Sequence, residues 1–164
     1  MLFIKLWHHI VCVIQMIVLK ILYGKRFQIG KNVTWRSSFS VMIETNGSVT
    51  IGDNCFFNNG CSIASNQNIA IGEGTLFGEN VKVYDHNHRF RSVATPIKEQ
   101  GFSNGNVSIG KHCWIGSNVV ILKGALIEDN CVIGAGCVID YKVEPGSIVK
   151  LNSKHFITTQ MSRA

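Results

Sequence analysis

An aliphatic residue returns at every sixth position in the C-terminal half of the chain. The segment IGKHCW-IGSNVV-ILKGAL-IEDNCV-IGAGCV-I places isoleucine there six times in succession, at Ile109, Ile115, Ile121, Ile127, Ile133 and Ile139. A small residue usually follows four places later. A period of six is neither the helical period of 3.6 nor the strand alternation of two. Three such hexads form an 18-residue turn of a triangular prism, in which short strands make the faces and each aliphatic side chain points inward.

The same phase occurs upstream, which extends the prism over most of the chain. It is clear from Ile51 (IGDNCF) and from Ile71 (IGEGTL), and weaker traces begin at Ile29. A single coil cannot bury its own apolar side chains, so the pattern must continue through neighbouring coils. We therefore expect a mainly β protein, a parallel β-helix that covers roughly residues 29–149.

Five of the six cysteines stand in the small inner position of a hexad (Cys55, Cys61, Cys113, Cys131 and Cys137). A buried free cysteine behaves as a small apolar residue. We therefore expect core packing rather than disulfides or metal ligation. Free thiols also suit a reducing, cytoplasmic compartment.

The repeat is interrupted once, beginning at the stretch VYDHNHRF (residues 83–90). After Val83 the next inward residue would fall at position 89, yet the clear pattern resumes only at Ile109. Residues 84–108 are therefore predicted to leave the prism as a long loop. Loops of this length in a rigid repeat are usually functional, and this one could reach a neighbouring subunit.

The first 24 residues differ in composition and predict a separate apolar helix, followed by the β-helix domain over residues 25–150 and a tail over 151–164. Only 14 uncharged residues separate Lys5 from Lys20, which is short for a membrane span. On a helix, the few polar residues form a narrow stripe: Lys5, His8, His9, Cys12 and Gln15. Basic residues at positions 20, 25 and 26 follow. The helix could lie on a membrane surface, which would make the protein peripheral to the inner face of a membrane, or pack on protein.

The net charge of +6 suits nucleic acid, anionic lipid or a phosphorylated ligand. No other feature supports nucleic-acid binding, so we expect no nucleic-acid partner.

Two segments carry a family resemblance, VSIGKHCWIGSNVVI (residues 107–121) and IGAGCVI (133–139), together with the Asp/His cluster that opens the loop. The chain resembles the hexapeptide-repeat acyltransferases with a left-handed parallel β-helix, and more narrowly the galactoside and maltose O-acetyltransferases and their surface-polysaccharide relatives. The resemblance implies a homotrimer with active sites between subunits. It also implies transfer of acetyl from acetyl-CoA to a sugar, such as a polysaccharide precursor or a lipid-linked sugar.

The resemblance also implies the catalytic residues. An ungapped alignment from Asn80 and Val81 puts the family's catalytic histidine on His88, and its asparagine, 30 residues earlier, on Asn58. A backbone N–H at Ser117 corresponds to the oxyanion donor. The chemistry needs these groups, because an imidazole can take the proton of a sugar hydroxyl and an aimed N–H stabilises the tetrahedral oxyanion.

Further residues are expected to bind the two substrates. Asp85, His86 and Arg89 are candidates for contact with the sugar, although Asp85 could instead orient a histidine. Candidates for contact with acetyl-CoA are Trp114, Ser117, Ala135, Lys150 and Lys154. The end of the chain, EPGSIVKLNSKHF, departs from the family's closing turn, which leaves the length of the acyl chain open.

Three alternatives are compatible with these residues. His86 and His88 would share one face of an extended segment and, with His112, could form a zinc site of the carbonic anhydrase type, although the expected pair of histidines five positions apart is absent. The acceptor could be an amine instead of a hydroxyl. A non-catalytic binding β-helix is disfavoured, because it usually carries regular rows of one polar residue such as Thr.

Overall fold

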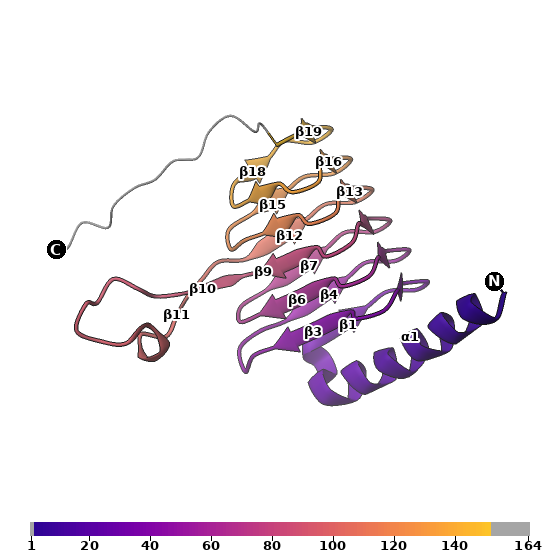
Figure 1. Cartoon of the computed structure of the whole chain (residues 1–164), viewed down its shortest axis with the longest axis horizontal. Helices are drawn as coiled ribbons and strands as arrows, with labels where there is room; N and C mark the ends of the chain where they lie inside the picture. Colours follow the sequence, from indigo (N-terminus) through magenta and orange to yellow (C-terminus); the bar gives the residue numbers. More distant parts are fainter. Residues whose placement is uncertain (1, 152–164) are drawn as a thin grey trace.

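A computed structural model describes residues 2–151 and shows a parallel β-helix closed at one end by an N-terminal helix (Figure 1). The helix α1 (Leu2–Tyr23) runs into a short 3₁₀ turn, η1 (Gly24–Arg26). Six coils follow, and the last of them has two strands. The expected fold class is confirmed.

The coils stack directly on one another, so the prism has three parallel sheets. One sheet contains β1 (Phe27–Ile29), β4 (Val49–Ile51), β7 (Ile69–Ile71), β12 (Val107–Ile109), β15 (Leu126–Ile127) and β18 (Lys142–Val143). The second contains β2 (Thr34–Trp35), β5 (Phe56–Phe57), β8 (Leu76–Phe77), β13 (Trp114–Ile115), β16 (Val132–Ile133) and β19 (Ile148–Val149). The third contains β3 (Ser40–Ile43), β6 (Ser62–Ser65), β9 (Lys82–Tyr84), β14 (Val120–Ile121) and β17 (Val138–Ile139). We call them the first, second and third sheets.

The inward column of isoleucines forms as the hexads predict. From Ile109 to Ile139, all six are at most 2% exposed, and adjacent coils pair in register, for example Ile115 with Ile133. Towards α1 the column becomes aromatic. The rings of Trp35, Phe39, Phe57 and Phe77 stack in sequence, with centroids 4.4 to 4.9 Å apart. In the first coil, Trp35 and Phe39 take inner positions that smaller residues hold elsewhere, which explains why the six-residue pattern is faint there.

The five hexad cysteines are buried and free, as expected. Four of the thiols donate to backbone carbonyls of the next coil, for example Cys61 Sγ to Gly78 O at 3.1 Å and Cys113 Sγ to Glu128 O at 3.2 Å. Burial raises the pKa of both thiols. The thiols therefore stay protonated near neutral pH and act as packing groups instead of nucleophiles.

The helix α1 covers the open end of the prism, and among its described side chains Cys12, Gln15 and Leu19 face the first coil. Cys12 and Leu19 are buried against the first coil. Gln15 donates from Nε2 to Phe39 O at 2.7 Å and accepts from Trp35 Nε1 at 2.9 Å. Within residues 2–151, no helix is long and apolar enough to cross a membrane.

Candidate active site

The extra residues between β9 and β12 form a hairpin that projects from the edge where the third sheet meets the first (Figure 1). Its strands β10 (His86–His88) and β11 (Phe102–Asn104) are antiparallel, and a 3₁₀ turn, η2 (Ile97–Glu99), lies near the tip. Both ends are fixed to the prism. The Nδ2 of Asn66 donates to Asn104 Oδ1, and Gly124 N donates to Asn106 O. The rigid prism therefore determines where the base of the hairpin lies.

Asp85 is the main anchor of the hairpin, and its side chain is fully buried. Its carboxylate accepts from Ser65 Oγ at 2.7 Å and from the backbone N–H groups of Asn66 and Gln67 at 2.7 and 2.8 Å. The ring of His86 lies within 3.0 Å through Nδ1. With its oxygens occupied in this way, the carboxylate is placed to orient His86. It is turned away from solvent, where a sugar would bind.

The two histidines of the loop lie on the same face of β10, as their spacing predicts. Both rings contact Phe102, with centroids 5.1 Å away for His86 and 4.6 Å for His88. They differ in environment, since the side chain of His86 is 18% exposed and bonded to Asp85, whereas His88 is exposed. His88 therefore offers a ring that a second molecule can reach.

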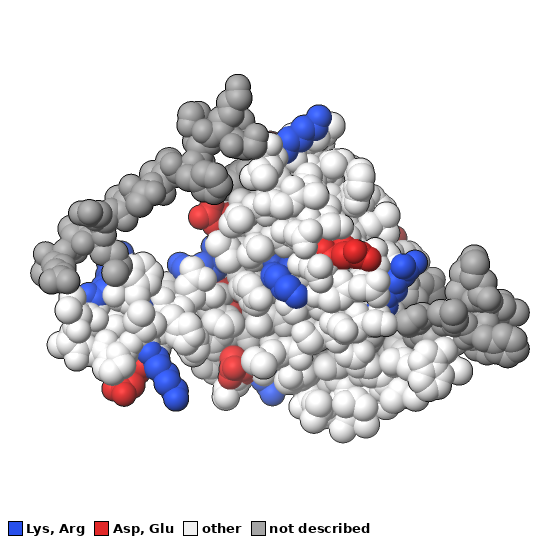
Figure 2. Space-filling view, in the orientation of Figure 1, with Lys and Arg blue, Asp and Glu red and all other residues white. Residues whose placement is uncertain are grey.

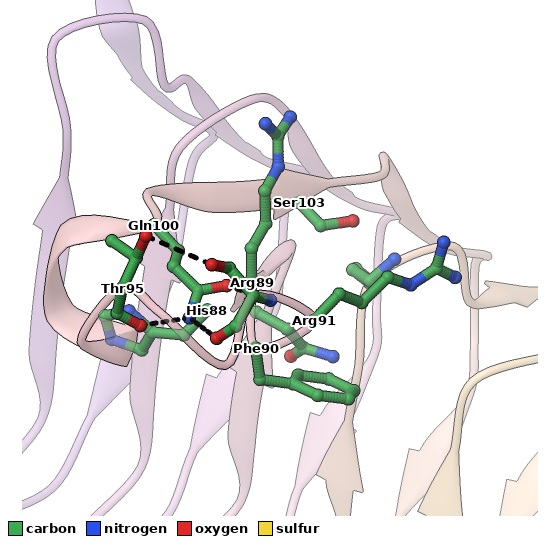
Figure 3. Close-up of a pocket in the computed structure, with 10 residues that line it drawn as sticks. His88, Arg89, Phe90, Arg91, Thr95, Gln100 and Ser103 are labelled. Carbon is green, nitrogen blue, oxygen red and sulfur yellow. Dashed lines mark hydrogen bonds between the residues drawn. The ribbon is translucent and has the colours of Figure 1, made fainter. Parts of the chain in front are cut away.

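His88 also lines a pocket of about 750 Å³ between the hairpin and the prism (Figure 3). The lining includes Arg89 and Arg91 from the hairpin and Lys123 from the turn after β14. Figure 3 shows the two guanidinium groups pointing in different directions. Gln100 holds the tip together, because its side chain bonds Ser92 and Thr95. No carboxylate lines the pocket among the described residues, so its charge favours an anionic ligand.

Phe102 and Lys123 also belong to this surface, although no sequence pattern indicates either of them. Phe102 comes opposite His88 through the antiparallel pairing of β10 with β11. Lys123 comes beside the hairpin through the stacking of coils. The Gly and Asn residues around positions 101–106 indicate that the chain turns back towards the prism there. They do not predict which residues of β11 pair with which residues of β10.

A second group of expected residues lies along another edge, where the second sheet turns into the third. Backbone bonds from Asn58 N to Phe77 O, Gly116 N to Ile133 O and Gly134 N to Val149 O keep this edge in register from coil to coil. Ser117 and Ala135 therefore lie on adjacent coils. Asn58 lies two coils below Ser117, about 10 Å away for coils spaced about 4.8 Å apart. Lys150 ends the same edge one coil above Ala135.

The backbone at this edge is tightly packed and leaves polar groups exposed to solvent. A Cβ on Gly116 would lie 2.7 Å from Ala135 N, and one on Gly78 would lie 2.6 Å from Ser117 N. Among the described residues, no acceptor takes the backbone N–H of Ser117, whereas its carbonyl accepts from Gly136 N at 2.9 Å. A free N–H next to a close-packed glycine can donate to a ligand oxygen.

Trp114 lies beside this edge, on the outward face of β13. Its side chain is 58% exposed, and it is flanked in register by Leu76 and Val132. It offers a flat apolar surface to a ligand or to another copy of the chain.

The remaining expectations concern His112 and Lys154. His112 lies in the turn between β12 and β13 and packs over Gly74, where a Cβ would come 2.6 Å from its Nδ1. Within residues 2–151, no group of three His, Cys, Asp or Glu side chains is placed to hold a metal ion. Lys154 lies outside the described residues.

The two groups of residues belong to different edges of one prism. The hairpin with His88 leaves the edge between the third and first sheets and points away from the body (Figure 1). Asn58, Ser117 and Ala135 lie on the edge between the second and third sheets. A single chain therefore does not bring His88 and Ser117 together on one edge.

Comparisons with known proteins match this architecture. A family model described as bacterial transferase hexapeptide (six repeats) matches residues 106–140. The chain is 28% identical to WbbJ of Escherichia coli, assigned to lipopolysaccharide biosynthesis as an O-acetyl transferase, over 63% of this chain and 56% of WbbJ. It is 31% identical to the galactoside O-acetyltransferase of Escherichia coli, over 61% of this chain and 48% of that protein. The chain thus spans about half the length of these relatives.

Solved structures share the fold. A galactoside acetyltransferase in complex with coenzyme A superposes with a TM-score of 0.56 and 30% identity, over 71% of this chain and 57% of that chain. The chain therefore carries the hexapeptide repeat of the bacterial transferases on a parallel β-helix, and its resemblance to the galactoside and surface-polysaccharide O-acetyltransferases is confirmed.

Proposed function

We propose that the chain transfers acetyl from acetyl-CoA, its acyl-donor substrate, to a hydroxyl group of a sugar in a polysaccharide precursor or a lipid-linked glycan. The observation that carries the proposal is an accessible histidine on an anchored hairpin, combined with a backbone N–H, at Ser117 on an edge of the repeat fold, that is unpaired within residues 2–151. The relatives named as a galactoside O-acetyltransferase and as an O-acetyl transferase of lipopolysaccharide biosynthesis support the substrate class. The solved complex with coenzyme A supports the donor.

In the proposed mechanism, His88 takes the proton of the acceptor hydroxyl as its oxygen attacks the thioester carbonyl. The N–H of Ser117 donates to the resulting oxyanion, and the Asn58 carboxamide holds the acceptor oxygen in line. Collapse of the tetrahedral intermediate breaks the carbon–sulfur bond. The protonated His88 then returns its proton to the departing coenzyme A thiolate, so no covalent enzyme intermediate is needed.

The proposed assembly is a homotrimer, in which the hairpin of one copy meets the Asn58–Ser117 edge of the next. The outward face of the second sheet supports this proposal, because it carries an apolar column in register. Leu76, Trp114 and Ile148 in this column are 48%, 58% and 65% exposed in the single chain. The first sheet presents Thr50, Ala70 and Ser108 in the corresponding outward positions. A column of exposed apolar side chains is typical of a surface that another subunit covers.

The cations of the pocket fit phosphate groups. Arg89, Arg91 and Lys123 would bind the phosphates of acetyl-CoA, or those of a phosphorylated or lipid-linked acceptor.

His86 is proposed to support the hairpin beneath His88, because its Nδ1 is bonded to the carboxylate of Asp85.

The test is release of free coenzyme A from acetyl-CoA in the presence of a panel of sugar acceptors, with acetylated product identified by mass spectrometry. Acetyl transfer should depend on an acceptor hydroxyl and fall at least about a hundredfold in His88→Ala, the usual scale for loss of a general base. His86→Gln should lose less, because an amide can keep a hydrogen bond to Asp85. Near-normal turnover by a folded His88→Ala protein would overturn the assignment of His88. Transfer to amines alone would overturn the hydroxyl acceptor.

A further inference from the structure

The outward half of α1 is a continuous apolar surface with no partner among the described residues. Nine large apolar side chains on it are 41% to 76% exposed: Trp7, Ile10, Val11, Val13, Ile14, Ile17, Val18, Ile21 and Leu22. At about 100° per residue, they cover roughly half of the helix circumference. Figure 2 shows the lower edge of the molecule, where α1 lies, as a largely uncharged surface.

An ordinary surface helix turns its one apolar side to the protein, whereas α1 has apolar residues both on the side that faces the protein and on the side that faces away. On the side that faces the protein, Gln15 donates to Phe39 O and accepts from the indole N–H of Trp35. Cys12 and Leu19 complete the contact. A solvent-exposed apolar surface of this size marks an interaction site, because the hydrophobic effect opposes leaving it in contact with water.

The charge distribution indicates what covers this surface. The first 43 residues contain six Lys or Arg residues and no acidic residue, whereas residues 44–164 contain ten of each. The whole net charge of +6 therefore belongs to the helix and the first coil. Among these basic side chains, Lys20, Lys25, Lys31 and Arg36 are exposed. A protein partner needs no such excess, whereas an anionic bilayer attracts cations beside an apolar helix face.

We propose that α1 lies in the plane of an anionic membrane surface, with the side chains around Ile14, Ile17 and Ile21 inserted among the lipids and the prism standing on the surface. A second copy of the chain is the less fitting occupant, because the apolar column on the second sheet already offers a self-association surface. The proposal goes beyond acetyl transfer and does not rest on it. It would bring the candidate site close to lipid-linked acceptors.

The test is co-flotation of the purified full chain with vesicles in a density gradient. Vesicles of phosphatidylcholine with about one-third phosphatidylglycerol should carry the protein to the top, and pure phosphatidylcholine vesicles should carry much less. Replacing the centre of the apolar face, Ile14→Glu with Ile17→Glu and Ile21→Glu, should lower the bound fraction at least about tenfold. Lys20→Gln and Lys25→Gln should each lower binding to the anionic vesicles about fivefold.

The matched control replaces exposed apolar residues elsewhere, Val93→Glu with Ile97→Glu on the hairpin, and should float like the unaltered chain. Circular dichroism and the unfolding temperature establish that each variant is folded, and the two lysine variants provide the test if the isoleucine variant is not. Failure of the unaltered chain to float with anionic vesicles would overturn the proposal. Equal flotation of the lysine variants would also contradict it. So would dissociation of the lipid-free oligomer by the isoleucine variant, measured by analytical ultracentrifugation, because that result would assign the face to another copy.

Discussion

Replacement of Asp85 by alanine tests whether one buried carboxylate anchors the hairpin to the prism. The side chain is fully buried and takes hydrogen bonds from Ser65, Asn66 and Gln67, with His86 Nδ1 also within 3.0 Å. Asp85→Ala would leave these donors without their charged acceptor. The root of the hairpin would then be held by the weaker side-chain amide bonds from Asn66 to Asn104 and from Gln67 to Asn106.

The size of the effect follows from the number and burial of the donors. A hydrogen bond to a charged group contributes about 1.5 to 3 kcal/mol, and an unsatisfied buried donor costs about 1 to 3 kcal/mol. Ser65 is buried, but the amides at Asn66 and Gln67 lie nearer the surface and can regain water. We therefore expect a loss of about 3 to 5 kcal/mol in the free energy of unfolding, or roughly 10 °C in the unfolding temperature.

The assay is chemical denaturation followed by circular dichroism, with Asp129→Ala as the matched control. Asp129 is an exposed carboxylate at a corner of the prism and takes one backbone bond, from Lys111 N at 2.7 Å. Its loss should cost about 1 kcal/mol or less. Equal, small effects of the two substitutions would refute the reasoning that the buried network at Asp85 holds the hairpin.

Two further predictions concern the prism. Gly72→Ala should destabilise the fold by about 1 to 3 kcal/mol or more, because the new Cβ would lie 2.5 Å from the carbonyl carbon of Gly110, and thermal unfolding measures the change. The stability should also fall as the pH rises through the thiol range, because burial raises the pKa of Cys55, Cys61 and Cys113. Below about pH 8.5 these thiols are protonated in both the folded and the unfolded chain. Above that pH the unfolded chain loses their protons first, which favours the unfolded state. Melting curves between pH 7 and 10 measure the loss, and unchanged stability over that range would contradict the effect.

Much of the fold could be predicted because the repeat reports burial at every sixth residue. Ile121 and Cys131 are buried because each occupies an inward position of its hexad. That position can be assigned from the local sequence alone, without knowledge of long-range contacts. The anchoring of Asp85 could not be predicted, because its donors belong to a turn about 20 residues earlier. An aspartate is also seldom buried without such partners.

The orientation of α1 on the prism could not be predicted from the sequence either. Its polar stripe was compatible with a membrane surface or with the protein body, and the choice depended on where Gln15 would find partners. The first coil provides them through Phe39 O and the Trp35 indole. The edges of Asn58, Ser117 and His88 do follow from the hexad phase, because Asn58 and Ser117 come after the second inward residue of a coil and the hairpin comes after the third. That placement decides whether one chain can hold a complete site.

The most direct test of the central claim, that the site forms between copies, is complementation in mixed trimers. His88→Ala and Asn58→Ala should each be nearly inactive as separate proteins. If His88 of one copy works with Asn58 of the next, unfolding and refolding an equal mixture should restore roughly a quarter of the unaltered acetyl transfer, because one interface in four pairs two intact residues. If both residues act within one chain, no mixed trimer contains an intact site. A mixture as inactive as its components, despite proven exchange of subunits, would contradict the account.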